Sequence, residues 1–152
     1  MHRLIRAEGL SEPISHYSDA VRAGDAIYVS GQASVDGSGR LVGRGDVVAQ
    51  TRQVLENMKL ALAAAGATLD DVVKVTVYLA RCADRPKVNE VRKAYFGANR
   101  PASTLVGIGE FAIDGMLVEI EAVAVIRRRG ARPRATARPR RAALRSTRRP
   151  RR

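Results

Sequence analysis

Two glutamates near residue 120 are the side chains best placed to do proton chemistry. Residues 117–126 alternate apolar and other residues, which is typical of a β-strand with one face in a core. Side chains two residues apart on a strand share a face, so Glu119 and Glu121 are predicted to lie side by side, opposite the apolar face. Carboxyl groups can donate and accept protons, so we interpret Glu119 as a candidate general acid or base. The apolar positions are Val118, Ile120, Ala122 and Ala124.

Other catalytic constellations are missing from the sequence. No pair of histidines or cysteines has the spacing of a zinc site, and the glycines of residues 37–45 are not followed by the Lys-Ser/Thr of a phosphate loop. Cys82 has no histidine near it in sequence to activate a thiolate, so we interpret it as inert. We therefore expect no metal and no organic cofactor.

The charge of the chain is concentrated at its C-terminal end. Thirteen of the 27 basic residues are arginines after residue 126, where no acidic residue occurs, so residues 1–126 carry 14 bases against all 15 acids. Segment 127–152 is rich in Arg, Pro and Ala without apolar periodicity, and we predict a disordered basic tail. Two interpretations stay open: a non-specific site for nucleic acid or another anionic partner, and an extension without function. Removing it should leave folding and oligomeric state unchanged.

Residues 1–126 are predicted to form one α+β domain. Strands are expected at 26–32, 72–79, 102–109 and 117–126, and helices at 47–65 and at about 84–96. Asp46 is the expected N-cap of the first helix, and Gly66 stands where a left-handed C-cap is needed. The two amphipathic helices are expected to pack on one face of the sheet.

Three side-chain patterns follow from these elements. Strand 26–32 should carry Tyr28, Ser30 and Gln32 on its more polar face. Strand 72–79 should carry its alternating apolar residues, Val73, Val75, Val77 and Leu79, on one face. The second helix places an arginine among apolar residues on one side: Val88, Val91, Arg92 and Tyr95.

Short stretches from about residue 10 to 126 carry a resemblance to the YjgF/RidA family. The chain is similar to that family, in the same order, at residues 17–21, 29–32, 50–51, 57, 64–66, 73–79, 88–91, 95–96, 101–102 and 118–125. The resemblance implies a chorismate-mutase-like fold and a homotrimer with ligand clefts between subunits. It also implies hydrolysis of reactive imines or enamines, such as that of a 2-imino acid to a 2-keto acid and ammonia, without a cofactor.

The resemblance assigns roles to individual residues. It implies catalytic roles for Glu119, Tyr17 and Ser30, and ligand-binding roles for Asn89, Ser103, Arg100 and Gly31. Family members that deaminate imino acids place a carboxylate-binding arginine directly after the Pro-Ala pair, where this chain has Ser103. Arg100 is the alternative cation, although on a strand it would project to the opposite face from Ser103.

Three functions remain open from the sequence. The first is an imine or enamine deaminase-like hydrolase that is weak on 2-imino acids because Ser103 is neutral. The second is a non-catalytic trimer that binds a small ligand, and the third is an RNA-associated protein that uses its basic tail. No apolar run reaches the length of a membrane span and no signal peptide is visible, so a cytoplasmic location is expected. His16 is a further titratable group whose role stays open.

Overall fold

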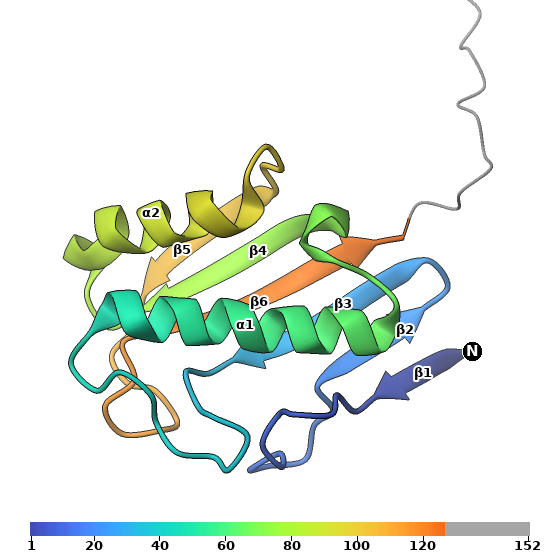
Figure 1. The fold of residues 1–152 in the computed structure, drawn as a ribbon, viewed down its shortest axis with the longest axis horizontal. Coiled ribbons are helices and arrows are strands. Elements are labelled where there is room, and N and C mark those ends of the chain that lie inside the picture. Colours follow the sequence, from blue (N-terminus) through green and yellow to red (C-terminus); the bar gives the residue numbers. More distant parts are fainter. Residues whose placement is uncertain (127–152) are drawn as a thin grey trace, which may run out of the picture.

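The fold is one six-stranded sheet with two helices on one of its faces (Figure 1). The computed structural model describes residues 1–126. The strand order is β1-β2-β3-β6-β4-β5, in which only β4 and β5 run parallel. The expected α+β architecture with both helices on one side is confirmed.

Six strands and two longer helices make up the domain. The strands are β1 (His2–Ile5), β2 (Ala20–Ala23), β3 (Ala26–Gln32), β4 (Val72–Leu79), β5 (Ala102–Gly107) and β6 (Val118–Val125). The helices are α1 (Val47–Ala65) and α2 (Arg85–Phe96). A short 3-10 turn, Leu69–Asp71, comes after α1, and another, Cys82–Asp84, comes directly before α2.

Helix α1 begins and ends where its capping residues predict. The side chain of Asp46 accepts hydrogen bonds from the backbone N–H groups of Val48 and Ala49, which otherwise lack a partner in the first turn. Gly66 adopts a left-handed conformation with φ 85° and ends the helix. Helix α1 then crosses β3 and β6, and α2 lies beside it over the β4 and β5 side of the sheet (Figure 1).

The core lies between the helices and the inner face of the sheet. It is built from aliphatic residues, including Leu55, Met58 and Leu62 of α1 against Val77 and Ile120 of the sheet. The opposite face of the sheet carries Tyr28, Val106 and Val125 exposed to solvent. One face is therefore covered by helices, and the other is uncovered in the single chain.

Several details differ from the sequence-based expectation. Strands β1 and β2 were not predicted, because each has only four residues and little alternation. A register shift between Val72 and Lys74 turns Val73 outward, so Val72 replaces it in the core. A second shift between Val29 and Gln32 turns Gln32 inward, away from the face of Tyr28. The strand expected at 102–109 ends at Gly107.

None of the helices in the described part of the chain is both long and apolar enough to cross a membrane. The expected basic tail, residues 127–152, lies outside the described residues.

Candidate functional site

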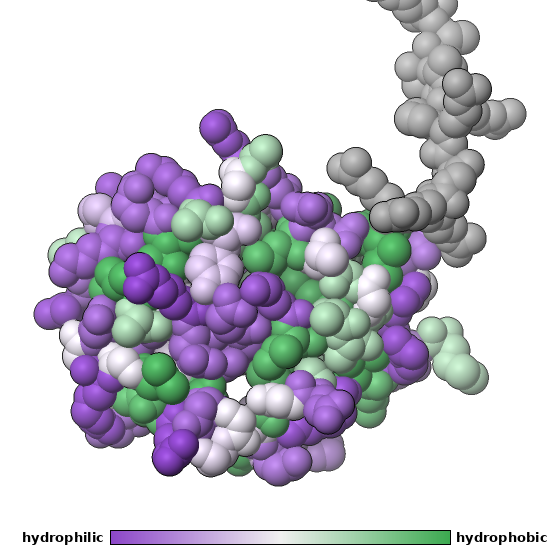
Figure 2. Space-filling model, in the orientation of Figure 1, coloured by the Kyte–Doolittle hydropathy of each residue, from purple (hydrophilic) through white to green (hydrophobic). Residues whose placement is uncertain are grey.

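One cavity opens where β3 ends and β6 begins. It has a volume of about 450 Å³ and is walled by the loop between β1 and β2, the end of β3, part of α1 and the loop before β6. Figure 2 shows an opening on the helix-bearing face, below α1. Four of the predicted site residues line this cavity: Tyr17, Ser30, Gly31 and Glu119. We call it the Glu119 cavity.

Glu119 reaches over Gly31, and the absence of a side chain at Gly31 leaves room for the Glu119 carboxylate. A Cβ placed on Gly31 would collide with the Glu119 carboxylate, since it would lie 2.8 Å from the carboxylate carbon and closer still to Oε1. Burial raises the pKa of Glu119, and the neighbouring charge of Glu121 raises it further. The Glu119 carboxyl group therefore holds a proton more readily than an exposed glutamate, which suits a group that exchanges protons with a ligand.

Ser30 and Tyr17 approach the cavity from neighbouring segments. The Ser30 hydroxyl donates a hydrogen bond of 2.7 Å to the carbonyl of Ser18, so its lone pairs are left to accept one from a ligand. Tyr17 is 48% exposed and stands in the loop between β1 and β2. Loop geometry therefore decides where the Tyr17 ring lies relative to Glu119.

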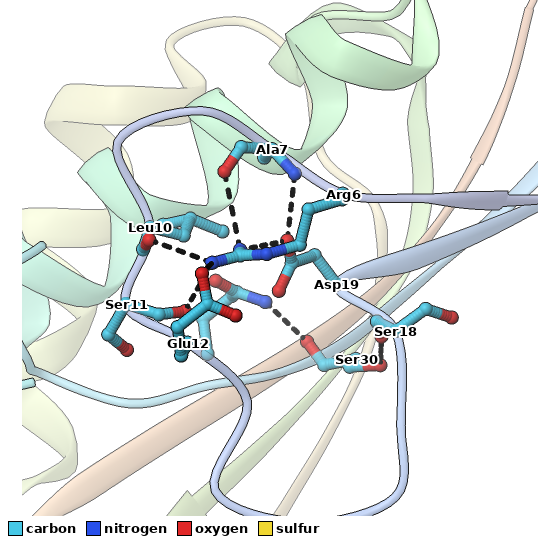
Figure 3. Close-up of polar contacts among 9 residues, drawn as sticks. Arg6, Ala7, Leu10, Ser11, Glu12, Ser18, Asp19 and Ser30 are labelled. Carbon is cyan, nitrogen blue, oxygen red and sulfur yellow. Dashed lines mark hydrogen bonds and ion pairs between the residues drawn. The ribbon is translucent and has the colours of Figure 1, made fainter.

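Arg6 fastens the loop that carries Tyr17 (Figure 3). Its guanidinium pairs with Asp19 at 2.6 Å and donates to the carbonyls of Leu10 and Ser11 at 3.1 and 3.0 Å. Asp19 is buried, with 4% of its surface exposed, and also accepts the backbone N–H of Ala7 at 2.8 Å. The Arg6 side chain thus connects the two ends of the loop with its middle through hydrogen bonds and an ion pair.

Two buried amides of α1 hold the remaining walls of the cavity. Asn57 donates to the carbonyls of Ala33 and Val35, just after β3. Gln50 donates to the carbonyl of Gly115 and accepts the N–H of Leu117, just before β6. The helix therefore positions both segments that flank Glu119.

The other predicted site residues lie elsewhere. A second cavity, also about 450 Å³, is lined by Asn89, Arg92, Lys93 and Arg100 together with the segment from Phe96 to Pro101. We call it the Arg92 cavity. It lies at the β5 edge of the sheet, two strands away from β6, so in one chain Asn89 and Arg100 do not meet Glu119. Because the resemblance implies clefts between subunits, a single subunit does not test whether Asn89 and Glu119 share a cleft.

Ser103 contacts a guanidinium, although its own position lacks one. Arg92 Nη2 lies 3.1 Å from Ser103 Oγ, and Arg92 Nη1 donates to Asn89 Oδ1 at 3.3 Å. Burial lowers the pKa of Arg92, and its Nε is buried without a hydrogen-bond partner. Arg92 was not predicted as a site residue, although its place among the apolar residues of α2 was a usable signal.

Arg100 does not lie on strand β5, contrary to the sequence-based expectation. Arg100 precedes β5 by two residues and is exposed in the connection from α2, so strand alternation does not fix its direction. His16 is exposed in the loop that carries Tyr17 and does not line the Glu119 cavity. Among residues 1–126, no group of three or more His, Cys, Asp or Glu side chains is placed to hold a metal ion.

Comparison with known proteins identifies the class of this domain. The model of the family described as "Endoribonuclease L-PSP" matches residues 9–126. The chain therefore belongs to this family, which is the YjgF/RidA family, and the resemblance seen in the sequence is confirmed.

Individual relatives agree with this assignment. A RutC family protein of Pyrococcus horikoshii is 44% identical over 124 residues, which cover 82% of this chain and 98% of the relative. The human protein named 2-iminobutanoate/2-iminopropanoate deaminase is 40% identical over 126 residues, or 82% of this chain and 90% of the relative. A 3-aminoacrylate deaminase RutC of Acinetobacter baylyi is 40% identical over 121 residues, or 80% and 95%.

Solved structures share the fold. RidA from an Antarctic Psychrobacter superposes with a TM-score of 0.77 at 35% identity, covering 82% of this chain and 99% of that one. TdcF of E. coli, solved with bound serine, gives a TM-score of 0.77 at 31% identity, covering 82% and 99%.

Proposed function

We propose that this protein is a RidA-type imine or enamine deaminase that uses no metal and no organic cofactor. The observation that carries the proposal is the half-buried Glu119, whose pKa is raised and which shares a cavity with Tyr17 and Ser30. Relatives named as deaminases of 2-imino acids and of 3-aminoacrylate support the same class of reaction.

The reaction needs water, a proton donor and a fixed substrate. Water adds to the C=N carbon, a proton moves to the nitrogen, and the tetrahedral adduct then loses ammonia to leave a carbonyl group. Glu119 takes the proton of the attacking water and returns it to the leaving nitrogen. The hydroxyl groups of Ser30 and Tyr17 bind and orient the polar atoms of the substrate.

The substrate is a small, reactive imine or enamine. Ser103 stands where related deaminases place a carboxylate-binding arginine, and a neutral hydroxyl cannot form a bidentate ion pair. We therefore expect weak turnover of 2-imino acids. A charge-assisted pair is worth about 1.5–3 kcal/mol per hydrogen bond, so losing it would reduce substrate capture by about 10²-fold.

The assembly is proposed to be a homotrimer with its ligand clefts between subunits. The uncovered sheet face, with Tyr28, Val106 and Val125 exposed, offers apolar surface for such contacts. A cleft between subunits would also unite two cavities that one chain keeps apart. Light scattering should report about three subunit masses, whereas a monomer at micromolar concentration would contradict the assembly.

Ammonia release tests the function. An amino acid oxidase generates 2-iminobutanoate in place, and semicarbazide traps the imine that has not been hydrolysed. The amount of semicarbazone is compared with and without the protein. A neutral imine of similar size is assayed in parallel. Acceleration of either hydrolysis supports the enzyme, and no acceleration of any imine would leave a small-ligand-binding protein as the better description.

The RNA-associated alternative depends on residues 127–152, which lie outside the described part of the chain. Full-length protein and protein ending at residue 126 are compared for RNA binding over a range of salt concentrations. Loss of binding on truncation would assign it to the tail, and equal binding would place it in the domain. A cytoplasmic location likewise remains a prediction.

A further inference from the structure

Arg92 is a cation whose surroundings contain no counter-charge. Both of its hydrogen-bonded partners, Ser103 Oγ and Asn89 Oδ1, are neutral oxygens, and no acid of residues 1–126 forms an ion pair with it. Its Nε is buried and has no partner. Partly buried guanidinium groups normally sit against a carboxylate or phosphate, because neutral partners do not offset the lost hydration of the charge.

Every charged residue that lines the cavity around Arg92 is basic. Arg92, Lys93 and Arg100 line it, and no acidic side chain does. Lys93 is already paired with Glu90 at 2.7 Å, and Arg100 stands exposed at the far side. Arg92 is therefore the cation in this cavity that is both partly buried and free of an acidic partner in the described domain.

The neighbours of Arg92 fix its direction. Ser103 holds one terminal nitrogen and Asn89 holds the other, so the plane of the guanidinium is set from β5 and from α2 itself. Because Asn89 Oδ1 accepts from Arg92, the Asn89 amide N–H groups are left to donate to the same ligand. A guanidinium that is already oriented loses less conformational entropy when an anion binds.

We propose that Arg92 is the anion-binding residue of this protein, with Ser103 and Asn89 as its positioning residues, and that it binds the carboxylate of an imino or keto acid. The positive charge thus comes from α2, whereas position 103 on β5 supplies only a hydroxyl. This inference rests on the proposed function for the identity of the ligand. It predicts that the turnover of 2-imino acids that persists without an arginine at position 103 depends on Arg92.

Binding of a non-reacting carboxylate tests this assignment without requiring catalysis. The probe is 2-oxobutanoate, the keto acid that corresponds to 2-iminobutanoate, titrated into the full-length protein by calorimetry. We expect Arg92→Gln and Arg92→Ala to weaken binding by about 10²-fold, because a charge-assisted bidentate pair is lost. Arg92→Lys keeps the charge but not the fork, and should fall between them and the wild type.

The matched control is Arg85→Ala, which removes an arginine from the first turn of the same helix, outside the lining of the Arg92 cavity. Its binding of 2-oxobutanoate should equal that of the wild type. All variants keep residues 127–152, so any non-specific attraction of the arginine-rich end is common to them. Circular dichroism and melting temperature check that the Arg92 variants are folded.

A transfer of the arginine makes the test sharper. Ser103→Arg combined with Arg92→Ala moves the guanidinium from α2 to β5, and it should recover part of the lost binding. Ser103→Arg alone should gain little, because the new guanidinium would lie against Arg92, and like charges repel.

The outcomes separate this inference from the proposed function. Equal binding by wild type, Arg92→Gln and Arg85→Ala, or no binding by the wild type, would overturn the role of Arg92. Arg92-dependent binding without ammonia release would support that role and contradict the deaminase. Ammonia release that is unchanged in kcat/KM by Arg92→Gln would support the deaminase and overturn the role of Arg92.

Discussion

The Glu119 cavity and the Arg92 cavity are similar in volume and opposite in character. The first has carboxylates and hydroxyls, and it is held by Arg6, Asn57 and Gln50 through hydrogen bonds within one chain. The second has cations and no acid in its lining. The groups proposed for proton transfer and for anion binding are therefore separated within the subunit, and the proposed trimer is the assembly in which one ligand could contact both.

The largest expected effect comes from a substitution that changes the Glu119 cavity and leaves the Arg92 cavity intact. Glu119→Gln removes the group proposed to exchange protons, so turnover should fall by about 10²-fold or more. Binding of 2-oxobutanoate should largely remain, because the Arg92 cavity is unchanged. The measurements are imine hydrolysis and calorimetry on the same preparation.

Glu110→Gln is the control for that substitution, since Glu110 is exposed and does not line the Glu119 cavity. It should leave both turnover and binding unchanged. Full turnover by Glu119→Gln would show that another group moves the proton.

Gly31→Ala, a substitution in β3, should displace the Glu119 carboxylate. The added methyl group would displace the end of the Glu119 side chain, which can rotate away, so the melting temperature should change little. Turnover should fall by about 10-fold, because a general base must lie within hydrogen-bonding reach of its proton.

Gly109→Ala provides the comparison for Gly31→Ala, because a Cβ at Gly109 would meet no atom within 4 Å. It should leave turnover unchanged. If both variants kept full turnover, the position of the Glu119 carboxylate would not matter for catalysis.

Arg6→Ala should loosen the loop of the Glu119 cavity and leave the Arg92 cavity intact. Asp19 would lose its ion pair while remaining buried, and the carbonyls of Leu10 and Ser11 would lose their donor. The melting temperature should fall, and hydrogen exchange should speed up in residues 7–19. Arg40→Ala, which removes a much more exposed arginine, should change neither quantity appreciably.

The smallest expected effect concerns pH. The ordinary pKa of Glu119 is 4.5 and folding raises it, so the folded state binds this proton more tightly than the unfolded state. The wild type therefore loses stability as pH rises from about 4.5 through the higher folded-state pKa. Glu119→Gln should match the wild type in melting temperature at about pH 4 and exceed it at about pH 8. A difference that does not vary with pH would contradict the raised pKa.

The sequence predicted the long elements, and four of its candidate site residues line the Glu119 cavity. Helix α1 was predictable because Asp46, the apolar spacing and Gly66 all agree. The four cavity residues followed from the family resemblance, although their catalytic roles remain predictions. Strands β1 and β2 were missed, because the pairing of four-residue segments with the sheet depends on tertiary contacts.

Local irregularities and long-range contacts limited the rest. The register shifts that turn Val73 outward and Gln32 inward break the two-residue alternation on which the prediction relied. Arg92 could be noticed as a cation on an apolar helix side, but its contact with Ser103 joins α2 to β5 and has no signature in local sequence.

The close approach of Glu119 to Gly31 also constrains how this domain can change over time. The carboxylate occupies the volume that a side chain at position 31 would need, so Glu119 keeps this position only while residue 31 is glycine. A relative with a larger residue at the place of Gly31 should carry a shorter one at the place of Glu119. Such a paired replacement would mark a protein that has kept the fold and given up this proton-transfer group.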